Sequence, residues 1–188
     1  MSIRTFISVD IEDPNVLPKI KLVKNSLSSL GADLKLVEDE NLHLTLVFIG
    51  EVPESQVTII KNALKEVKHR PFKIHLYGAG CFPTCNKPRV LWISTKEGSE
   101  EMIELYKKIA SSLRKERISF EEERNYVPHL TIARVRSNKN IAKVTKLLEA
   151  LIDEDFGWVE VREFRLKKST LTPKGPIYET LASFSLTE

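Results

Sequence analysis

The chain has 188 residues, of which 41% are hydrophobic and 29% are charged, a balance typical of globular proteins and unlike that of disordered or collagen-like chains. The longest apolar stretch, residues 44–49, is far shorter than the roughly 18 residues of a membrane span, and the opening MSIRTFISVDIED lacks the apolar core of a secretory signal. Its 29 basic and 26 acidic residues give a net charge of +3, which permits an RNA or phosphate partner without indicating one. We therefore expect a cytoplasmic protein with no membrane partner.

Strand and helix patterns alternate along the chain. β-Branched and apolar runs predict strands, and apolar residues at helical spacing between a cap or proline and a glycine predict helices. The predicted elements are a strand at 3–9, a helix at 14–30, strands at 34–37 and 42–49, a helix at 53–68, a strand at 72–77, a loop at 78–89, a strand at 90–95, a helix at 99–115, a strand at 128–135, a helix from 138 or 140 to 152, and strands at 158–168 and 178–186 joined by a turn at 172–176.

The two cysteines, Cys81 and Cys85, fall in the predicted loop at 78–89. A structural disulfide is not expected in a reducing cytoplasm. A zinc site would need two further ligands, and only His69 and His75 lie close in the sequence. We therefore predict two unpaired, half-buried cysteines.

Two sequence segments recur at an offset of 86 residues. Residues 6–8 (FIS) match 92–94 (WIS), and 43–46 (HLTL) match 129–132 (HLTI). The helices predicted to begin near Pro14 and Glu100 keep this offset, and so do those beginning at Glu54 and Asn140. Self-similarity at a fixed offset indicates duplication. We therefore predict a single domain over residues 1–188, made of two α+β lobes related by a pseudo-twofold axis, with repeats near 1–85 and 86–188.

Two of the four histidines lie in the repeated tetrapeptides, His43 and His129. Because side chains alternate along a strand, each histidine is expected to share a face with the threonine two residues later, Thr45 or Thr131. Alternation also places Val47 and Ala133 on this face, and Phe48 and Arg134 on the opposite one. The pseudo-twofold axis would bring the two His/Thr pairs to face each other across a cleft.

This set of side chains suits the chemistry of a phosphodiester. Two imidazoles near neutral pH can act as one base and one acid, and two hydroxyls can donate to the non-bridging oxygens. A catalytic metal would want three or four converging His, Asp or Glu ligands, and the tetrapeptides supply two histidines and no carboxylate. We therefore expect no metal and no cofactor.

The sequence resembles the 2H phosphoesterases, specifically the LigT-like RNA 2′,3′-cyclic phosphodiesterases that are also called 2′-5′ RNA ligases. The resemblance runs nearly end to end and rests on the two H-x-T-x motifs and on RTFISVD at 4–10, NLHLTLVFIGEV at 41–52, FP…PRVLW between 82 and 92, YVPHLTIAR at 126–134 and STLTPKGPIYETL at 169–181. One departure is Leu36, which stands where many relatives have a tryptophan shortly before the first motif.

The resemblance implies two mainly antiparallel sheets flanking a central cleft, with helices on the outside. It also implies that His129 accepts a proton from water, that His43 donates one to the departing 3′ oxygen, and that Thr45 and Thr131 hold the phosphate. The substrate would be RNA with a 2′,3′-cyclic phosphate end and the product a 2′-phosphate. A tRNA half, another RNA end or a small cyclic phosphate could be the physiological substrate, and we expect a monomer because a closed two-lobed unit has no obvious need for a partner. From symmetry alone the two histidines could exchange roles.

Phe48 and Arg134 are equivalent in the duplication, five residues after each histidine. The arginine could bind phosphate and the phenylalanine could stack on a base, provided that a twist or bulge turns them toward the cleft. Core packing is the competing interpretation for Phe48. Arg4, Lys87 and Arg89 are further cations that could line the cleft or remain solvated.

Three alternatives stay open. Ligation through a 2′-5′ bond uses the same residues in reverse, although abundant water favours hydrolysis. A binding module without catalysis would not need two titrating groups. A metallophosphoesterase would lose activity in a chelator.

Overall fold

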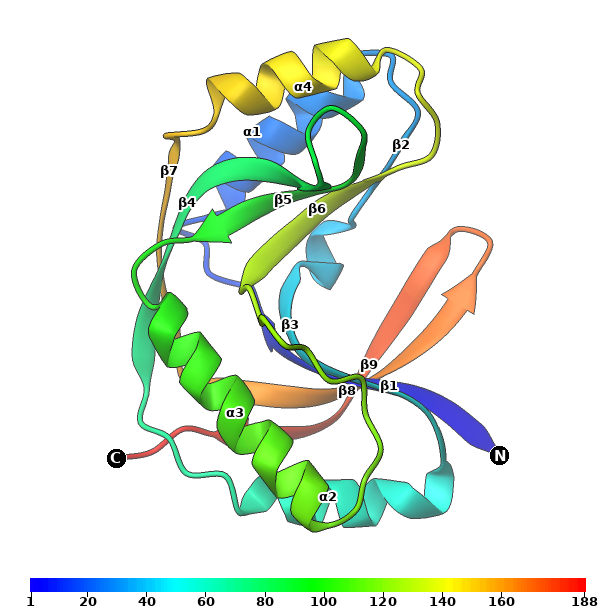
Figure 1. Ribbon diagram of the computed structural model, residues 1–188, viewed down its shortest axis with the longest axis vertical. Helices are drawn as coiled ribbons and strands as arrows, with labels where there is room; N and C mark the ends of the chain where they lie inside the picture. The colour runs from blue at the N-terminus through cyan, green and yellow to red at the C-terminus, as the bar shows by residue number, and fades with distance from the viewer.

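Strand pairing joins nine β-strands of the computed structural model, which describes residues 1–188, into one curled antiparallel sheet accompanied by four α-helices (Figure 1). None of the helices is long and apolar enough to cross a membrane. In chain order the elements are β1 (Ser2–Asp10), α1 (Leu17–Ser28), β2 (Leu34–Leu36), a 3₁₀ turn (Asp39–Asn41), β3 (His43–Pro53), a 3₁₀ turn (Glu54–Gln56), α2 (Val57–Lys65), β4 (Phe72–Pro83), β5 (Pro88–Thr95), α3 (Ser99–Lys115), β6 (His129–Val135), α4 (Ile141–Ala150), β7 (Asp155–Val161), β8 (Glu163–Thr172) and β9 (Gly175–Ser185).

The strand order, β7-β4-β5-β6-β3-β1-β8-β9 with β2 beside β6, places the strands that match at the 86-residue offset symmetrically about the centre. β6 and β3 meet there through one residue pair, Leu130 with Leu44. The α+β class is confirmed, and this one pair joins the two expected sheets into one. Both sequence halves contribute to each end of the sheet, because β4 pairs with β5 and β7 whereas β8 pairs with β1.

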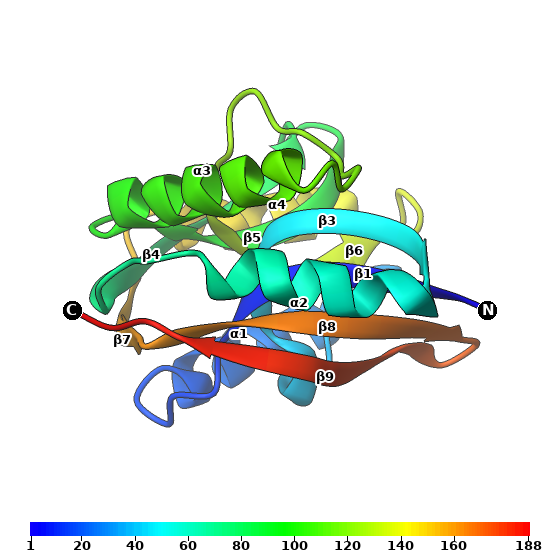
Figure 2. The same ribbon diagram turned by 90° about the horizontal axis from the view of Figure 1, so that it is seen from below.

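The helices form two pairs, one at each end of the sheet (Figures 1 and 2). α2 contacts α3 and β9, and α3 also contacts β3. At the other end, α4 contacts β4 and α1 contacts β2. The amide of Asn140, just before α4, donates hydrogen bonds to the carbonyls of Leu30 and Gly31 after α1. The buried faces of the sheet and helices form one continuous hydrophobic core, which leaves the opposite face of the central strands open.

Several predicted strand boundaries were wrong. β3 runs past Gly50 to Pro53, and β9 begins at Gly175 within the predicted turn. β4 continues to Pro83 through part of the predicted loop, because Gly78, with φ of +77°, lies within a register shift between Leu76 and Ala79 that the strand absorbs. The predicted strand at 158–168 is two strands, β7 and β8, which separate at Arg162 and pair at opposite ends of the sheet. No glycine or proline marks that break, so the sequence carried no signal for it.

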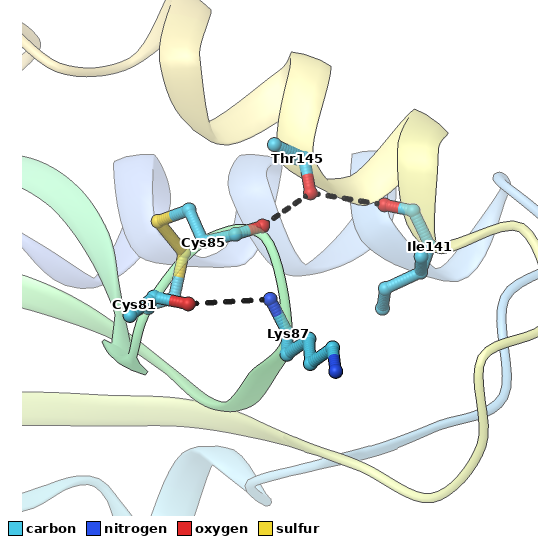
Figure 3. Close-up of a disulfide and its surroundings, with 6 residues drawn as sticks. Cys81, Cys85, Lys87, Ile141 and Thr145 are labelled. Atoms are coloured by element: carbon cyan, nitrogen blue, oxygen red, sulfur yellow. Dashed lines mark hydrogen bonds between the residues drawn. A yellow bond between two sulfur atoms is a disulfide. The ribbon is translucent and has the colours of Figure 1, made fainter.

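Cys81 and Cys85 form a disulfide (Figure 3), which corrects the prediction of unpaired cysteines. The hairpin between β4 and β5 brings their Cα atoms to 5.2 Å, within the range that a disulfide bridges. The Thr145 hydroxyl of α4 donates to the Cys85 carbonyl at 2.9 Å and ties this loop to the helix. The prediction was based on the cellular compartment, which says nothing about the distance that this turn imposes.

Candidate active site

The two H-x-T motifs meet at the centre of the sheet. Leu44 and Leu130, which pair across β3 and β6, are fully buried on the core face. Alternation along the strands turns the histidines and threonines that flank these leucines to the open face. The antiparallel register places His43 across from Thr131, and Thr45 across from His129. The predicted juxtaposition of the two His/Thr pairs is therefore present in the register of the central strands.

Backbone carbonyls fix the tautomers of both histidines. His43 Nδ1 lies 2.7 Å from the Asn41 carbonyl, and His129 Nδ1 lies 2.7 Å from the Val127 carbonyl. A carbonyl only accepts hydrogen bonds, so Nδ1 carries a proton in each ring and Nε2 is the nitrogen left to accept or donate a proton in a reaction. His43 Nε2 is 3.0 Å from Thr45 Oγ1, so the hydroxyl donates to the neutral ring, whereas it accepts from Nε2–H when the ring is protonated and its own proton is then free for another acceptor.

Aromatic side chains surround each imidazole. The His43 ring lies 5.2 Å from Phe6 and 5.4 Å from Tyr178, and the His129 ring lies 5.0 Å from Phe82. Burial among these groups lowers the pKa of His43, although the Asn41 carbonyl and the nearby Asp10 carboxylate act in the opposite direction. The free protein therefore favours neutral His43, and a bound anion would favour the imidazolium.

Asp10 is the register partner of His43 on β1 and is held ionised behind it. Burial alone would raise the Asp10 pKa, but hydrogen bonds from Lys167 at 2.6 Å and Ser8 at 2.7 Å, with Arg165 at 2.9 Å, lower it. Its negative charge favours protonated His43.

A cleft of about 520 Å³ opens over the two motifs. Five of the six predicted site residues line it, and the sixth, His129, lies at its margin against Phe82 and Trp92. The full lining is Arg4, Phe6, Lys35, Leu36, Val37, Glu38, Asn41, His43, Thr45, Phe48, Thr131, Arg134, Ser169, Leu171, Gly175, Pro176 and Tyr178. Three cations face one carboxylate, Glu38, so the cleft favours an anionic ligand.

Matched bulges bring Phe48 and Arg134 into this cleft. The β1–β3 register omits Leu46, and Leu46 and Val47 are both buried. The β5–β6 register likewise omits Ile132, and Ile132 and Ala133 are both buried. Each extra residue reverses the alternation beyond it. The predicted placement of Val47 and Ala133 beside the histidines was therefore wrong, and the bulge that Phe48 and Arg134 required is present.

Comparison with known proteins identifies the family of this chain. Residues 21–168 match the family model of the 2′-5′ RNA ligase superfamily. The chain belongs to the 2′-5′ RNA ligase superfamily. It is 42% identical to the RNA 2′,3′-cyclic phosphodiesterase of Archaeoglobus fulgidus, over 96% of this chain and 99% of that protein.

Solved structures agree on the fold of this superfamily member. A crystal structure from Thermus thermophilus superimposes with a TM-score of 0.79 at 27% identity, covering 98% of each chain. Escherichia coli LigT in complex with 3′-AMP superimposes with a TM-score of 0.76 over the whole of both chains. At 22% identity, this second likeness shows the fold alone.

The sequence-based site was incomplete for this superfamily member. Asn41, Lys35 and Tyr178 also line the cleft and were not predicted. Asn41 contacts His43 through its backbone carbonyl. Because any residue has such a carbonyl, the side chain at position 41 gave no sign of this role. Of the further cations considered, Arg4 lines the cleft and lies over the Phe48 ring at 4.8 Å, whereas Lys87 and Arg89 line a different hollow.

Proposed function

We propose that this protein hydrolyses RNA 2′,3′-cyclic phosphate ends to 2′-phosphates by acid–base catalysis with two histidines. The observation that carries the proposal is the pair of imidazoles, each with Nδ1 held by a backbone carbonyl, whose motifs meet at one cationic cleft. The name of the Archaeoglobus fulgidus relative supports this activity, and the binding of 3′-AMP by LigT supports a nucleotide ligand.

In the proposed reaction, neutral His129 takes a proton from water through Nε2 as the oxygen attacks phosphorus. The bond from phosphorus to the 3′ oxygen breaks, and His43 Nε2 gives that oxygen its proton. Thr45, Thr131 and Arg134 hold the non-bridging oxygens, where charge develops. Phe48 could stack on a base with the face of its ring. The Arg4 guanidinium lies over that ring at 4.8 Å and would have to move aside for the base to stack there.

The donor set of the cleft suits a reaction without a metal. Its lining offers one carboxylate, Glu38, and one motif histidine, His43, and even with His129 these groups are a weak set for a catalytic metal that would want three or four converging ligands. Three ligand-type residues that do converge, His69, Glu101 and Glu104, lie outside the cleft. The Lys108 ammonium is 3.1 Å from His69 Nδ1, and this positive charge opposes a cation there.

The finer features of the activity follow from the same residues. The reverse reaction would join a 2′,3′-cyclic end to a 5′-hydroxyl through a 2′-5′ bond without ATP. The proposed substrates include tRNA fragments, and the proposed setting is a monomer in the cytoplasm. Hydrolysis is the favoured direction because water far exceeds RNA ends in concentration.

The test is hydrolysis of a 2′,3′-cyclic nucleotide with excess EDTA between pH 5 and 9, for the wild type, His43→Ala and His129→Ala. We expect a bell-shaped profile in the wild type and losses of at least about 100-fold in each variant. Thr58→Ala, on the exposed face of α2, is the control and should match the wild type.

Each alternative predicts a different outcome. Loss of the wild-type activity in EDTA would favour a metallophosphoesterase. A wild type that binds RNA but hydrolyses none of the substrates would favour a binding module. Retained activity in either histidine variant would refute the two-histidine mechanism.

A further inference from the structure

A second hollow, which we call the upstream groove, lies between the β4–β5 hairpin, the end of β6 and the start of α4. Its volume is about 630 Å³. The nine residues that line it are Asn86, Lys87, Pro88, Arg89, Val135, Arg136, Ser137, Asn138 and Ile141. Three are cations and none is acidic. All three cations are exposed, and no ion pair of the structure includes them, so their charge is free for an external anion.

The upstream groove begins where β6 ends, two residues along the chain from the catalytic cleft. Arg134 faces the cleft, and Arg136, two residues further along the chain, faces the groove. Arg136 lies just past the end of β6, and residues two apart in an extended chain are separated by about 7 Å, a spacing similar to that of neighbouring phosphates in an extended nucleic-acid strand. β5 lies alongside, because Val90 pairs with Arg134 and places Arg89 next to this end of β6. Arg89 and Arg136 of the groove therefore lie close, across the strand pair and along the chain, to the arginine that lines the cleft.

Other hollows on the surface combine cations with carboxylates, unlike the upstream groove. Between α2 and α3, the side chains of Lys68, Lys107 and Lys115 line a hollow together with Glu66 and Glu104. Mixed charges of that kind are typical of a solvated surface, and they weaken the attraction for a polyanion. The upstream groove has only cations and neutral groups, which is the pattern expected of a phosphate-binding surface.

The hairpin that presents Lys87 is held in place from two sides (Figure 3). The Cys81–Cys85 disulfide closes its turn, and Thr145 of α4 donates to the Cys85 carbonyl. A loop fixed before binding loses less conformational freedom when a ligand arrives. The groove is therefore organised in advance of its ligand.

We propose that the upstream groove binds backbone phosphates of the nucleotides preceding the terminal cyclic phosphate, so that the protein acts preferentially on RNA strands rather than on cyclic mononucleotides. The inference rests on the proposed function and adds the length of the substrate to it. Contacts through Lys87, Arg89 and Arg136 would hold the backbone without reading sequence, and the terminal nucleotide alone would occupy the cleft.

The experiment compares kcat/KM for a cyclic mononucleotide and for a single-stranded six-nucleotide RNA ending in a 2′,3′-cyclic phosphate. The proteins are the wild type, Lys87→Gln/Arg89→Gln/Arg136→Gln, and the charge-matched control Lys68→Gln/Lys107→Gln/Lys115→Gln. We expect the groove variant to lose at least about tenfold on the RNA and to keep the mononucleotide rate. For the RNA, the slope of log kcat/KM against log salt concentration should also become shallower by about two in the groove variant, since each lost phosphate contact removes roughly 0.7 from that slope.

Fluorescence anisotropy with a labelled RNA of the same length, measured on the same proteins, separates this inference from the proposed function. Equal losses on both substrates, an equal loss in the control, or an unchanged RNA Kd in the groove variant would overturn the groove. A wild type that hydrolyses neither substrate would contradict the proposed function but not the groove. In that case, weaker RNA binding by the groove variant, with unchanged binding by the control, would still support the groove.

Discussion

The chemistry of the cleft depends on a few side chains, and the two bulges determine which side chains face the cleft. Strict alternation predicts Arg134 on the core face, where an unpaired guanidinium would be costly. The extra residue in β6 leaves Ile132 and Ala133 buried and turns Arg134 outward. Side-chain identity in the sequence suggested a phosphate ligand, but the register that makes it accessible depends on β5 and could not be seen in β6 alone.

Arg134→Gln should lower kcat/KM for a 2′,3′-cyclic substrate by roughly 10- to 100-fold, because a hydrogen bond to a charged group contributes about 1.5–3 kcal/mol. Arg124→Gln is the matched control, since Arg124 is exposed and lies outside both the cleft and the upstream groove. Steady-state rates and thermal unfolding of both variants make the measurement. An equal effect of the two substitutions would show that net charge, rather than a phosphate contact, is responsible.

His43 should titrate below its usual value of 6.5 in the free protein, since burial lowers its pKa. Saturation with inorganic phosphate should raise this pKa, because a nearby anion stabilises the imidazolium. NMR of the histidine ring resonances between pH 4 and 9 measures both states, and the Arg134→Gln variant tests whether the bound anion is the cause. An unchanged His43 pKa at saturating phosphate would contradict its role as the residue that is protonated beside the substrate.

At the scale of elements, β4 shows how packing can override a local signal. Glycines and prolines at 78–89 predict a loop, yet Gly80 is a strand residue opposite Trp92. A side chain at Gly80 would collide with the Trp92 ring, so glycine is required here by close approach rather than by a turn. The sequence does contain this information, but only when β4 and β5 are considered together.

Gly80→Ala should lower the free energy of unfolding by about 1–3 kcal/mol, the usual cost of overpacking. It should also lower kcat/KM, because Trp92 and Phe82 pack together beside His129. Denaturant unfolding and steady-state rates provide the two measurements. Adding Trp92→Phe should restore part of both losses, and a strictly additive double variant would show that the Gly80–Trp92 contact is not the cause.

At the scale of the whole molecule, the duplication is visible in the sequence but the exchange of strands between its halves is not. Matching tetrapeptides located the centre of the sheet correctly. They could not show that β4 joins strands of the second half, or that β8 pairs with β1, because those pairings leave no local pattern. The helices exchange as well, since α3 follows β5 but contacts α2 and β3.

This interleaving predicts that neither half folds alone. In a fragment spanning 1–85, β4 would lack both its partners, and β1 would lose β8 and with it one edge of its pairing. We expect the fragment, and its complement 86–188, to show poorly dispersed NMR spectra and no cooperative unfolding transition. A cooperative transition in either fragment would contradict a single domain and indicate two independent lobes.

At the edge of the sheet formed by β4 and β7, two exposed carboxylates pair with a buried histidine, and this cluster links stability to pH. His75 of β4 lies 2.7 Å from Glu97 and 2.8 Å from Asp155, and its ring stacks on Trp158 at 4.5 Å. Burial opposes protonation of His75, but the two carboxylates outweigh it and raise its pKa. The His75 hydrogen bond is in turn the main reason why the pKa of each carboxylate is lowered.

The sign of the pH dependence follows from these shifts. A raised His75 pKa stabilises the fold fully below the unfolded value of about 6.5 and loses that effect as the pH rises through the folded pKa. The lowered pKa values of the two carboxylates affect stability at acidic pH, because their stabilising contribution is lost only as the pH falls through those pKa values. Wild-type free energy of unfolding in urea should therefore decline between about pH 6 and pH 9 relative to His75→Gln, in which this dependence disappears. Parallel profiles for the two proteins would mean that the imidazolium, despite its two carboxylate partners, adds nothing to the stability of the folded chain.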